Sequence, residues 1–275
     1  MNVNRIIKVR QGNTLGAVQD FMSSLLTREL VDALFVPQTA ADGTVSAALV
    51  SHPDAIKRSN PFAPIMVANA AKQVAEATMK QPDRHIGAVL RPCEIRALVE
   101  LAKRGRASLA NLTVVGIDCL GTFAPFDYMR RMLAAGGVME MTAGCMQVAE
   151  EGEITCETRT ACRMCERPAP RGADVTLGFI GVDAANELLV IAADESADAR
   201  LCLDQVTDRT ATEREVVRRE ATLTNIIHKH NAVTDRELSK LEMSFGGLAG
   251  VLTTLATCTE CRLCLQACPL YDGEL

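Results

Sequence analysis

Apolar residues follow two spacings along the chain, one typical of buried strands and one typical of helices. Residues 85–90 and 112–119 are short apolar runs, which suit strands buried on both faces of a parallel sheet. Between them, residues 92–104 place apolar side chains on one side and end before Gly105, as a helix often does. This order predicts a strand–helix–strand crossover unit.

The same reasoning predicts further elements before and after this unit. Helices are expected over residues 14–30, 63–79 and 125–136, and strands over residues 33–36, 44–50, 175–180 and 187–192. From residue 212 onward the pattern becomes charged and helical. We therefore predict an α/β domain over residues 1–200, with a mostly parallel sheet and flanking helices. Residues 201–275 should form a helical, ferredoxin-like C-terminal appendage.

The most specific motif lies near the end of the chain and reads Cys258-Thr-Glu-Cys261-Arg-Leu-Cys264-Leu-Gln-Ala-Cys268-Pro. Its C-x2-C-x2-C-x3-C-P spacing is that of bacterial ferredoxins, whose cysteines ligate a 4Fe-4S cluster. Zinc sites usually use two separated pairs instead. In two-cluster ferredoxins the fourth cysteine serves the other cluster, so Cys268 either completes its own cluster or reaches a partner subunit. The motif predicts that the protein transfers electrons.

Composition narrows the class of protein. Eleven cysteines occur without an N-terminal secretory signal, which favours metal ligands in a reducing compartment and hence a cytoplasmic protein. A net charge of -5 without basic runs argues against nucleic acid as a partner. The weakly polar stretch over residues 245–256 is too short to span a bilayer, so an integral membrane protein is not expected.

A second, dispersed group of cysteines lies in the middle of the chain. Cys93 and Cys119 each follow a predicted strand, and the carboxyl ends of neighbouring parallel strands border one crevice. Cys162 and Cys165 form a C-x2-C pair. Taken singly, a cysteine after a strand is more often a small buried residue, and a lone C-x2-C pair also suits zinc or a redox disulfide.

The remaining cysteines and polar residues leave alternatives open. Either Cys145 or Cys156 could replace Cys93 or Cys119 as a ligand, or Cys156 could join the C-x2-C pair in a zinc site. Cys202 is expected in the core, and His228 and His230 are expected to be solvated or to cap a helix. Asp118 either orients a cofactor or caps the next turn.

Three sequence blocks together resemble a known family. They span residues 91–102 (Arg-Pro-Cys-Glu-Ile-Arg-Ala-Leu-Val-Glu-Leu-Ala), residues 114–123 (Val-Val-Gly-Ile-Asp-Cys-Leu-Gly-Thr-Phe) and residues 162–181, which contain the C-x2-C pair, an Ala-Asp and spaced glycines. In order and spacing they are similar to the beta subunits of coenzyme F420-reducing hydrogenase and of related formate dehydrogenases. The resemblance covers about residues 15 to 195.

The resemblance implies cofactors, partners and site residues. It implies one internal 4Fe-4S cluster bound by Cys93, Cys119, Cys162 and Cys165, which with the C-terminal motif makes two 4Fe-4S clusters. It also implies FAD near Asp174, Gly178 and Gly181, and electron transfer between a catalytic oxidoreductase subunit and a redox partner.

One segment departs from the family pattern. Relatives carry two glycines after a Gln-Asp or Gln-Ser pair at a helix start near the flavin, whereas Gln19-Asp20 is followed here by Phe21-Met22. Glycine allows close approach of a ring or phosphate to the backbone. The sequence therefore supports the clusters best, FAD next and coenzyme F420 least.

Three functions remain as hypotheses. The first is an iron–sulfur electron-transfer subunit of a complex such as a formate dehydrogenase or hydrogenase. The second is a stand-alone FAD-dependent oxidoreductase acting on coenzyme F420, a small quinone or ferredoxin. The third is a non-redox scaffold with zinc at its cysteines.

Overall fold

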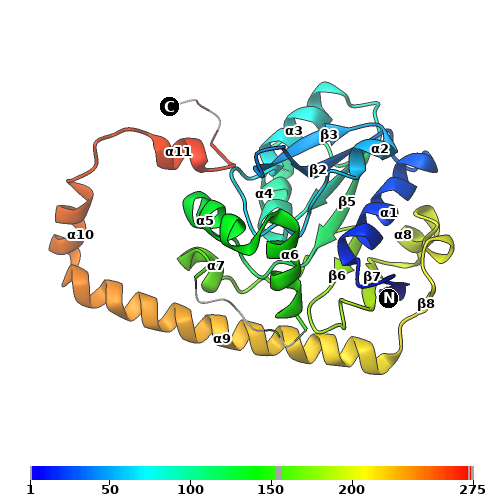
Figure 1. The fold of residues 1–275 in the computed structure, drawn as a ribbon. Helices are drawn as coiled ribbons and strands as arrows, with labels where there is room; N and C mark the ends of the chain where they lie inside the picture. The colour runs from blue at the N-terminus through cyan, green and yellow to red at the C-terminus, as the bar shows by residue number, and fades with distance from the viewer. Residues whose placement is uncertain (1, 151, 153–156, 272, 274–275) are drawn as a thin grey trace.

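An eight-stranded sheet forms the centre of the computed structural model, which describes residues 2–150, 152, 157–271 and 273 (Figure 1). The strand order across the sheet is β3-β2-β4-β5-β6-β7-β1-β8. The strands are β1 (Val3–Lys8), β2 (Ala33–Thr39), β3 (Val45–Val50), β4 (Ile86–Leu90), β5 (Leu112–Ile117), β6 (Val175–Gly178), β7 (Glu187–Ala192) and β8 (Arg209–Thr210).

The predicted α/β class is confirmed, and the parallel pairings lie in the middle of the sheet. Strands β2, β4, β5 and β6 pair in parallel. Antiparallel strands extend this centre on both sides, with β3 on β2 and with β7, β1 and β8 beyond β6. The carboxyl ends of β4, β5 and β6 therefore lie side by side, where an α/β sheet usually binds its ligands.

Helices cover both faces of the parallel centre. On one face, α3 (Ala71–Lys80) and α4 (Pro92–Lys103) pack on Ile86, Ala88 and Leu90 of β4. On the other, α1 (Thr14–Thr27) packs with Val89 of the same strand. Side chains alternate between the two faces of a strand, so a strand covered on both faces is apolar throughout. This explains why the pattern over β4 and β5 is continuous rather than alternating.

The other helices connect this core to the C-terminal part. They are α2 (Pro53–Ile56), α5 (Pro125–Ala135), α6 (Val138–Gln147), α7 (Thr160–Arg163), α8 (Glu195–Arg200), the 3-10 helix η1 (Leu203–Gln205), α9 (Glu213–Phe245), α10 (Leu248–Leu255) and α11 (Leu263–Ala267). None of the described helices combines the length and apolar character that a membrane span needs.

Several element boundaries differ from the sequence prediction. The helix expected over residues 63–79 begins only at Ala71, because residues 63–70 run as an irregular segment whose backbone is bound by Arg91 and Glu94. Strand β1 and helix α6 were not predicted. The sequence of β1 is partly polar and so does not resemble a buried strand, although β1 pairs with both β7 and β8 inside the sheet.

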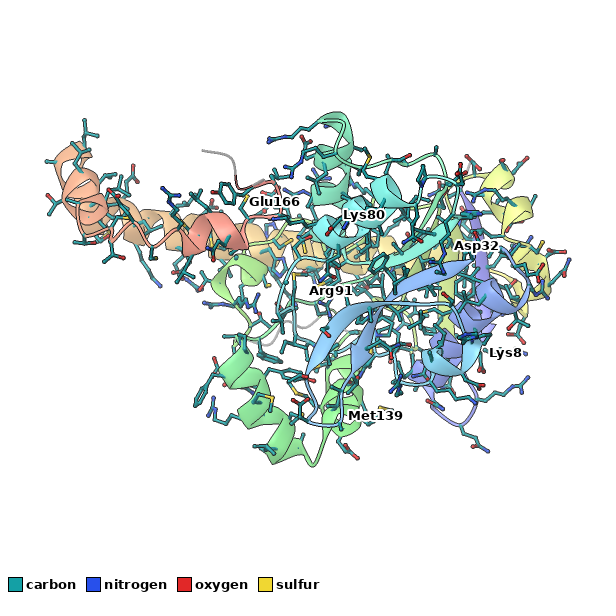
Figure 2. All side chains as sticks on the ribbon, turned by 90° about the horizontal axis from the view of Figure 1, so that it is seen from above. Lys8, Asp32, Lys80, Arg91, Met139 and Glu166 are labelled. Atoms are coloured by element: carbon teal, nitrogen blue, oxygen red, sulfur yellow. The ribbon has the colours of Figure 1, made fainter. Side chains whose placement is uncertain are left out.

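Residues on both sides of position 200 pack together. Strand β8 pairs with β1, and the first half of α9 lies on the domain, burying Arg219, Ile226 and His230. Farther along, α10 has no buried residue, and the views of Figures 1 and 2 agree that it stands away from the α/β body. The chain then returns: Leu270 packs against the core beside α3 and α4. The predicted appendage is therefore an arm attached to the domain at two places.

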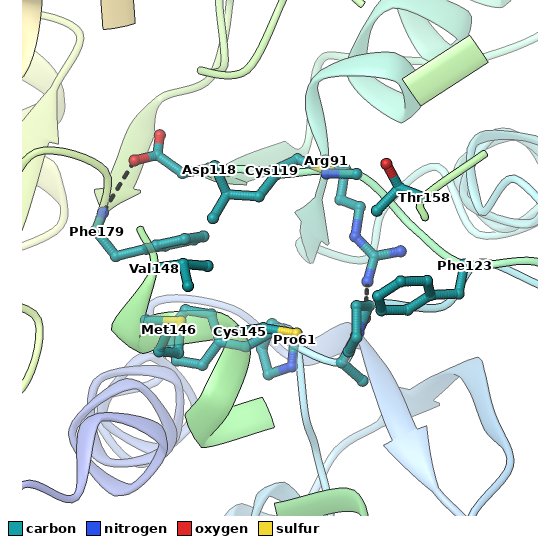
Figure 3. A pocket seen from close by; sticks show the side chains of 15 residues that line it. Pro61, Arg91, Asp118, Cys119, Phe123, Cys145, Met146, Val148, Thr158 and Phe179 are labelled. Carbon is teal, nitrogen blue, oxygen red and sulfur yellow. Dashed lines mark hydrogen bonds between the residues drawn. The ribbon is translucent and has the colours of Figure 1, made fainter. Parts of the chain in front are cut away.

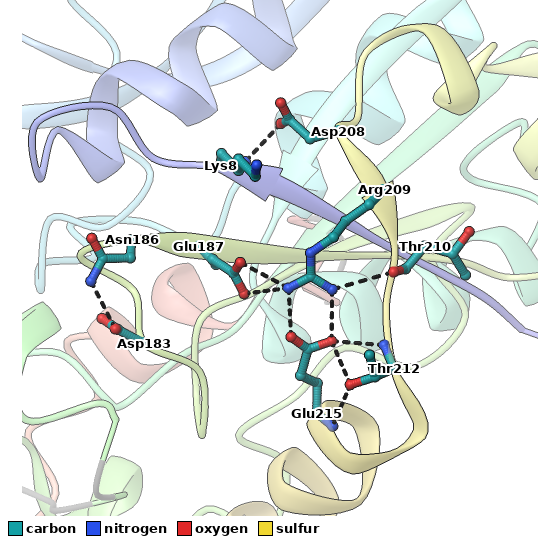
Figure 4. A network of polar contacts seen from close by, with 9 residues as sticks. All are labelled: Lys8, Asp183, Asn186, Glu187, Asp208, Arg209, Thr210, Thr212 and Glu215. Atoms are coloured by element: carbon teal, nitrogen blue, oxygen red, sulfur yellow. Dashed lines mark hydrogen bonds and ion pairs between the residues drawn. The ribbon is translucent and has the colours of Figure 1, made fainter.

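A network of charged groups fixes the start of α9 to the sheet (Figure 4). The Arg209 guanidinium on β8 pairs with Glu187 of β7 at 2.7 Å and with Glu215 of α9 at 2.6 Å. Glu215 also accepts a hydrogen bond from the backbone N–H of Thr212, while the Thr212 hydroxyl caps the helix. This is a capping box, strengthened here by an ion pair.

We expect the contribution of Glu215 to depend on pH. Its hydrogen bonds, first of all with Arg209, lower the pKa of Glu215 from 4.5 to about 2. Because the pKa is lower in the folded state, the stabilisation is present above pH 4.5 and is lost as the pH falls towards 2. The substitution Glu215→Gln should lower the free energy of unfolding by about 1–2 kcal/mol at pH 7.

Denaturant unfolding at a series of pH values checks this expectation. The difference between wild type and Glu215→Gln should shrink as the pH falls from about 5 to about 3. The exposed neighbour Glu213 provides the control, and Glu213→Gln should change stability little. A difference that stays constant with pH would mean that the carboxylate charge does not stabilise the helix start.

Candidate functional site

The carboxyl end of β4 places Arg91, Cys93 and Glu94 at the start of α4. Pro92 occupies the first helical position, which suits its fixed backbone angle. The Glu94 carboxylate accepts a hydrogen bond of 2.9 Å from the backbone N–H of Arg91. The buried Arg91 guanidinium donates to the carbonyl oxygens of Ala63 and Ile65 at 2.5 and 2.7 Å. The segment around Cys93 is therefore held by both backbone and side-chain contacts.

Cys119 follows β5, and its loop lies against the C-x2-C segment. The backbone N–H of Cys119 donates to the carbonyl oxygen of Pro168 at 2.8 Å, and the N–H of Gly121 lies 3.4 Å from the Cys119 sulfur. A Cβ atom on Gly121 would lie 3.0 Å from the Cβ of Cys162, and Gly121 has a φ of +103°. Glycine is therefore required here both by conformation and by the close approach of Cys162.

The short helix α7 contains Cys162, and Cys165 follows it by two residues. The Cys162 sulfur lies 3.5 Å from the Thr122 hydroxyl, and the N–H of Cys165 donates to the carbonyl oxygen of Cys162 at 3.1 Å. The two cysteines of the pair thus lie in one tight turn that faces the loop after β5.

Two of the four central cysteines have a raised pKa. The pKa of the Cys93 thiol is raised to about 12, first by burial in the surrounding protein and then by the nearby Cys119 and Glu94, although the residue itself is exposed. Burial also raises the pKa of Cys119 to about 11, with further contributions from Cys162 and Cys165. Arg91 acts in the opposite direction on both thiols. The loops after β4 and β5 and the C-x2-C turn lie next to one another, and the binding of a cluster by their cysteines stays a prediction.

A pocket lies beside Cys119 and is bordered by both polar and aromatic residues (Figure 3). Arg91, Asp118, Phe123, Cys145 and Phe179 are among its lining residues. A larger cavity of about 390 Å³ shares Phe62 and Met146 with this pocket. Its far wall contains Gly12, Asn13 and Thr14, at the N-terminus of α1.

Helix α1 begins at Thr14, as the sequence predicts. Residues 19–20 lie in the second turn of α1 rather than at a helix start, because the helix begins at Thr14 and Asn13 caps it. The Gln19 amide donates to the carbonyl oxygen of Ser59 at 2.7 Å. The helix start that faces the larger cavity is therefore formed by residues 12–15.

Asp118, at the end of β5, caps the distant turn after β6 rather than the next turn along the chain. Its carboxylate accepts hydrogen bonds from the backbone N–H groups of Phe179 and Ile180 at 2.9 and 3.0 Å. It also forms a two-pronged ion pair with Arg219 of α9, at 2.5 and 2.7 Å, and the side chains are 0% and 4% exposed. This buried pair ties α9 to the end of β5, next to Cys119.

The three predicted flavin residues make structural contacts in this conformation. A Cβ atom on Gly178 would lie 2.8 Å from the Arg219 guanidinium, and one on Gly181 would lie 2.9 Å from the Arg219 backbone. Both glycines therefore allow α9 to approach the sheet. Asp174 accepts from the N–H of Val114 at 2.7 Å and pairs with Arg200. A flavin contact by these residues stays a prediction.

Loss of the Arg219 charge should strongly destabilise the fold. Removing one partner of a buried ion pair leaves an uncompensated charge, which costs about 3–5 kcal/mol. We expect that loss for Arg219→Met. Arg218 is the matched control, since its pair with Glu150 has side chains that are 54% and 40% exposed, and Arg218→Met should cost less than about 1 kcal/mol. Equal losses in denaturant unfolding would contradict this.

His230 is buried, which corrects the expectation that it is solvated or caps a helix. Only 3% of the residue is exposed, and its Nδ1 hydrogen-bonds with the carbonyl oxygen of Cys165. Burial lowers the pKa of His230. His228 is exposed, as expected. The sequence holds little signal for this burial, because Arg219 and His230 are polar and only Ile226 is apolar among the buried residues of α9.

The remaining cysteines fall into separate environments. Cys145 lines the pocket beside Cys119, whereas Cys156 lies outside the described residues. Cys202 is partly exposed and has a φ of +48° before η1, so the expectation of a core residue was wrong. In the described part of the chain, no group of three or more histidine, cysteine or acidic side chains is arranged to hold a single metal ion.

The C-terminal cysteines lie between α10 and the end of α11. Cys258, Cys261 and Cys264 are exposed, and Cys268 is partly buried. Glu260 and Arg262, which alternate with them, have φ angles of +55° and +60°. Hydrogen bonds from the Leu263 N–H and the Thr259 hydroxyl lower the pKa of Cys261. The loop thus favours the thiolate form at one of its cysteines, the form that binds metals.

Comparisons with known proteins identify a family and relatives that this chain resembles. Residues 83–215 match the family described as the C-terminal part of the beta subunit of coenzyme F420 hydrogenase/dehydrogenase. That range contains all four central cysteines. The chain is 24% identical over 197 residues to the F420-dependent formate dehydrogenase 1 subunit beta of Methanococcus maripaludis, a match that covers 63% of this chain and 49% of the relative. The chain thus spans about half the length of that relative.

Two further similarities extend over more of the chain. The F420-dependent formate dehydrogenase subunit beta of Methanocaldococcus jannaschii is 22% identical over 293 residues, covering 95% of this chain and 74% of that protein. A chain of the F420-reducing NiFe hydrogenase complex from Methanosarcina barkeri has a similar fold, with a TM-score of 0.60 and 12% identity. That match covers 86% of this chain and 91% of the hydrogenase chain.

Proposed function

Since the chain belongs to the family of coenzyme F420 hydrogenase and dehydrogenase beta subunits, we propose that it is an iron–sulfur electron-transfer subunit of an oxidoreductase complex. Formate dehydrogenase or hydrogenase is the kind of complex that its relatives indicate. The observation that carries the proposal is the placement of the central cysteines. Cys93 and Cys119 follow the neighbouring strands β4 and β5, and the loop after β5 lies against the C-x2-C turn of Cys162 and Cys165.

The central cysteines fit the donor set of a 4Fe-4S cluster. Such a cluster takes four cysteine thiolates, and each thiolate binds a different iron of the cubane, so the sulfurs need not converge on one ion. Four thiolates also bring excess negative charge, which the buried Arg91 guanidinium would offset. Gly121 leaves room for the close approach of Cys162. We assign Cys93, Cys119, Cys162 and Cys165 to an internal cluster.

The C-terminal run is proposed to hold a second 4Fe-4S cluster through Cys258, Cys261, Cys264 and Cys268. The ferredoxin spacing supports this assignment, and the left-handed residues Glu260 and Arg262 turn the backbone sharply between successive cysteines. Exposure of three of the four cysteines suits a centre that meets a partner. The partners would be a catalytic subunit and a redox protein.

FAD is proposed in the cavity between the central cysteines and α1. The pocket beside Cys119 and the 390 Å³ cavity share Phe62 and Met146, and the cavity ends at the N-terminus of α1. A helix N-terminus favours a bound phosphate group, and a flavin supplies hydride chemistry when bound. This cavity also favours the second candidate, a flavin oxidoreductase that acts on coenzyme F420 directly.

Iron and sulfide analysis tests the two-cluster assignment. After anaerobic reconstitution we expect about eight iron atoms and about eight acid-labile sulfides per chain, because each cubane contains four of each. A brown protein with broad visible absorbance should result, and sharper flavin bands should appear if FAD binds. A value near four iron atoms would mean that one cysteine set holds no cluster, and a colourless zinc protein would refute the proposal.

A further inference from the structure

We propose that His230 is a positioning residue of the internal cluster site, where it holds the C-x2-C turn in place through the backbone carbonyl of Cys165. The inference rests on the proposed function, since it assumes that Cys162 and Cys165 bind the internal cluster. It assigns to α9 a role in that site, although α9 contributes none of the four cysteines.

Two side chains on one side of α9 contact the C-x2-C turn. The Nδ1 atom of His230 bonds with the carbonyl oxygen of Cys165. One helical turn later, the Thr234 hydroxyl lies 3.5 Å from the carbonyl oxygen of Met164. His230 is 3% exposed and Thr234 is partly buried. The Thr234 hydroxyl donates to the His230 carbonyl at 3.0 Å, so the hydrogen bond from α9 to the turn is the one from His230 to the Cys165 carbonyl, and Thr234 lies beside it.

The hydrogen bond also fixes which ring nitrogen of His230 carries a hydrogen. A carbonyl oxygen can only accept, so Nδ1 must be the donor. The Nε2 atom is buried and has no hydrogen-bond partner among the described residues. An apolar side chain would fill the same space without burying an unpaired nitrogen. What the imidazole adds at this position is therefore the bond from Nδ1 to the Cys165 carbonyl.

Residues that hydrogen-bond to metal-binding residues orient them, and loss of such a hydrogen bond commonly weakens metal binding. Here the same helix makes such contacts at two ligand segments. Arg219 pairs with Asp118, the neighbour of Cys119, and His230 binds the carbonyl of Cys165. The first half of α9 thus holds the segments that carry three of the four internal cysteines.

The test isolates the internal cluster in the full chain. In a background with Cys258→Ser, Cys261→Ser and Cys264→Ser, only the internal set can assemble a cluster. His230→Ala is compared with His230→Asn, whose side-chain nitrogen lies the same number of bonds from Cα as Nδ1. The exposed neighbour provides the control, His228→Ala. Loss of the cluster to a chelator is followed by visible absorbance, and folding by circular dichroism.

We expect His230→Ala to lose the cluster about 10-fold faster or more, in line with contacts behind other metal ligands. His230→Asn and His228→Ala should behave like the background protein. Equal rates in all variants would overturn the proposal, and so would equal loss in His230→Ala and His230→Asn, because space filling would then be the role of the ring.

Two further results complete the test. If His230→Ala does not fold, His230→Leu replaces it, since leucine fills the space without a hydrogen-bond donor, and unchanged cluster loss in that variant would overturn the proposed role of His230. If the background protein assembles no cluster at all, the proposed function itself fails, and the role of His230 fails with it.

Discussion

Replacing Cys162 by serine is expected to remove the internal cluster and about half of the bound iron, since each proposed site takes one four-iron cubane. Cys162 lies at the centre of the site, next to Gly121 and Thr122 of the loop after β5. A cluster at this position joins the segments after β4 and β5 to α7, which are distant in sequence. Its loss should therefore also lower the thermal stability of the reconstituted protein.

Matched cysteine variants show whether the ligand assignment is right. Cys93→Ser should have the same effect as Cys162→Ser, whereas Cys202→Ser, far along the chain at the start of η1, should leave the iron content unchanged. Cys145→Ser tests the neighbouring pocket residue. If Cys156→Ser removed the cluster while Cys93→Ser did not, the local group of cysteines would be the true ligand set.

The second large effect is expected from the C-terminal run. In the variant with Cys261→Ser and Cys264→Ser, the second cluster should be absent while folding and the internal cluster persist. Both side chains are exposed and lie on the arm, away from the sheet. Electron transfer to the partner subunit should then fall to background, because this cluster is proposed to lie on the path between the subunits.

These substitutions test the second cluster more specifically than a deletion of residues 257–275 would. Leu270 packs on the core beside α3 and α4, and Lys72 donates to the carbonyl oxygen of Tyr271, so a deletion would also remove packing contacts. Activity of the assembled complex with its physiological acceptor is measured beside activity of the catalytic subunit with an artificial dye. Full physiological activity in the variant would exclude the C-terminal cluster from the path.

The sequence alone predicts the parts of this protein that depend on short-range pattern. The apolar runs of β4 and β5 and the helix between them are visible because both faces of these strands are covered. The Cys258–Cys268 motif is visible because a cluster in one loop imposes a fixed spacing. The resemblance to a family pointed to the central cysteines, whose segments after β4, after β5 and around α7 are neighbours in the structure.

Other features became visible only in the tertiary structure, because they depend on contacts between segments that are distant in sequence. Strand β1 belongs to the sheet because β7 and β8 pair with it. Residues 63–70 are irregular because Arg91 and Glu94 bind their backbone, although their composition favours a helix. His230 and Arg219 are buried because α9 crosses the ends of the strands. A pattern of neighbouring residues cannot indicate these contacts, because the contacting residues lie up to about two hundred positions away in the sequence.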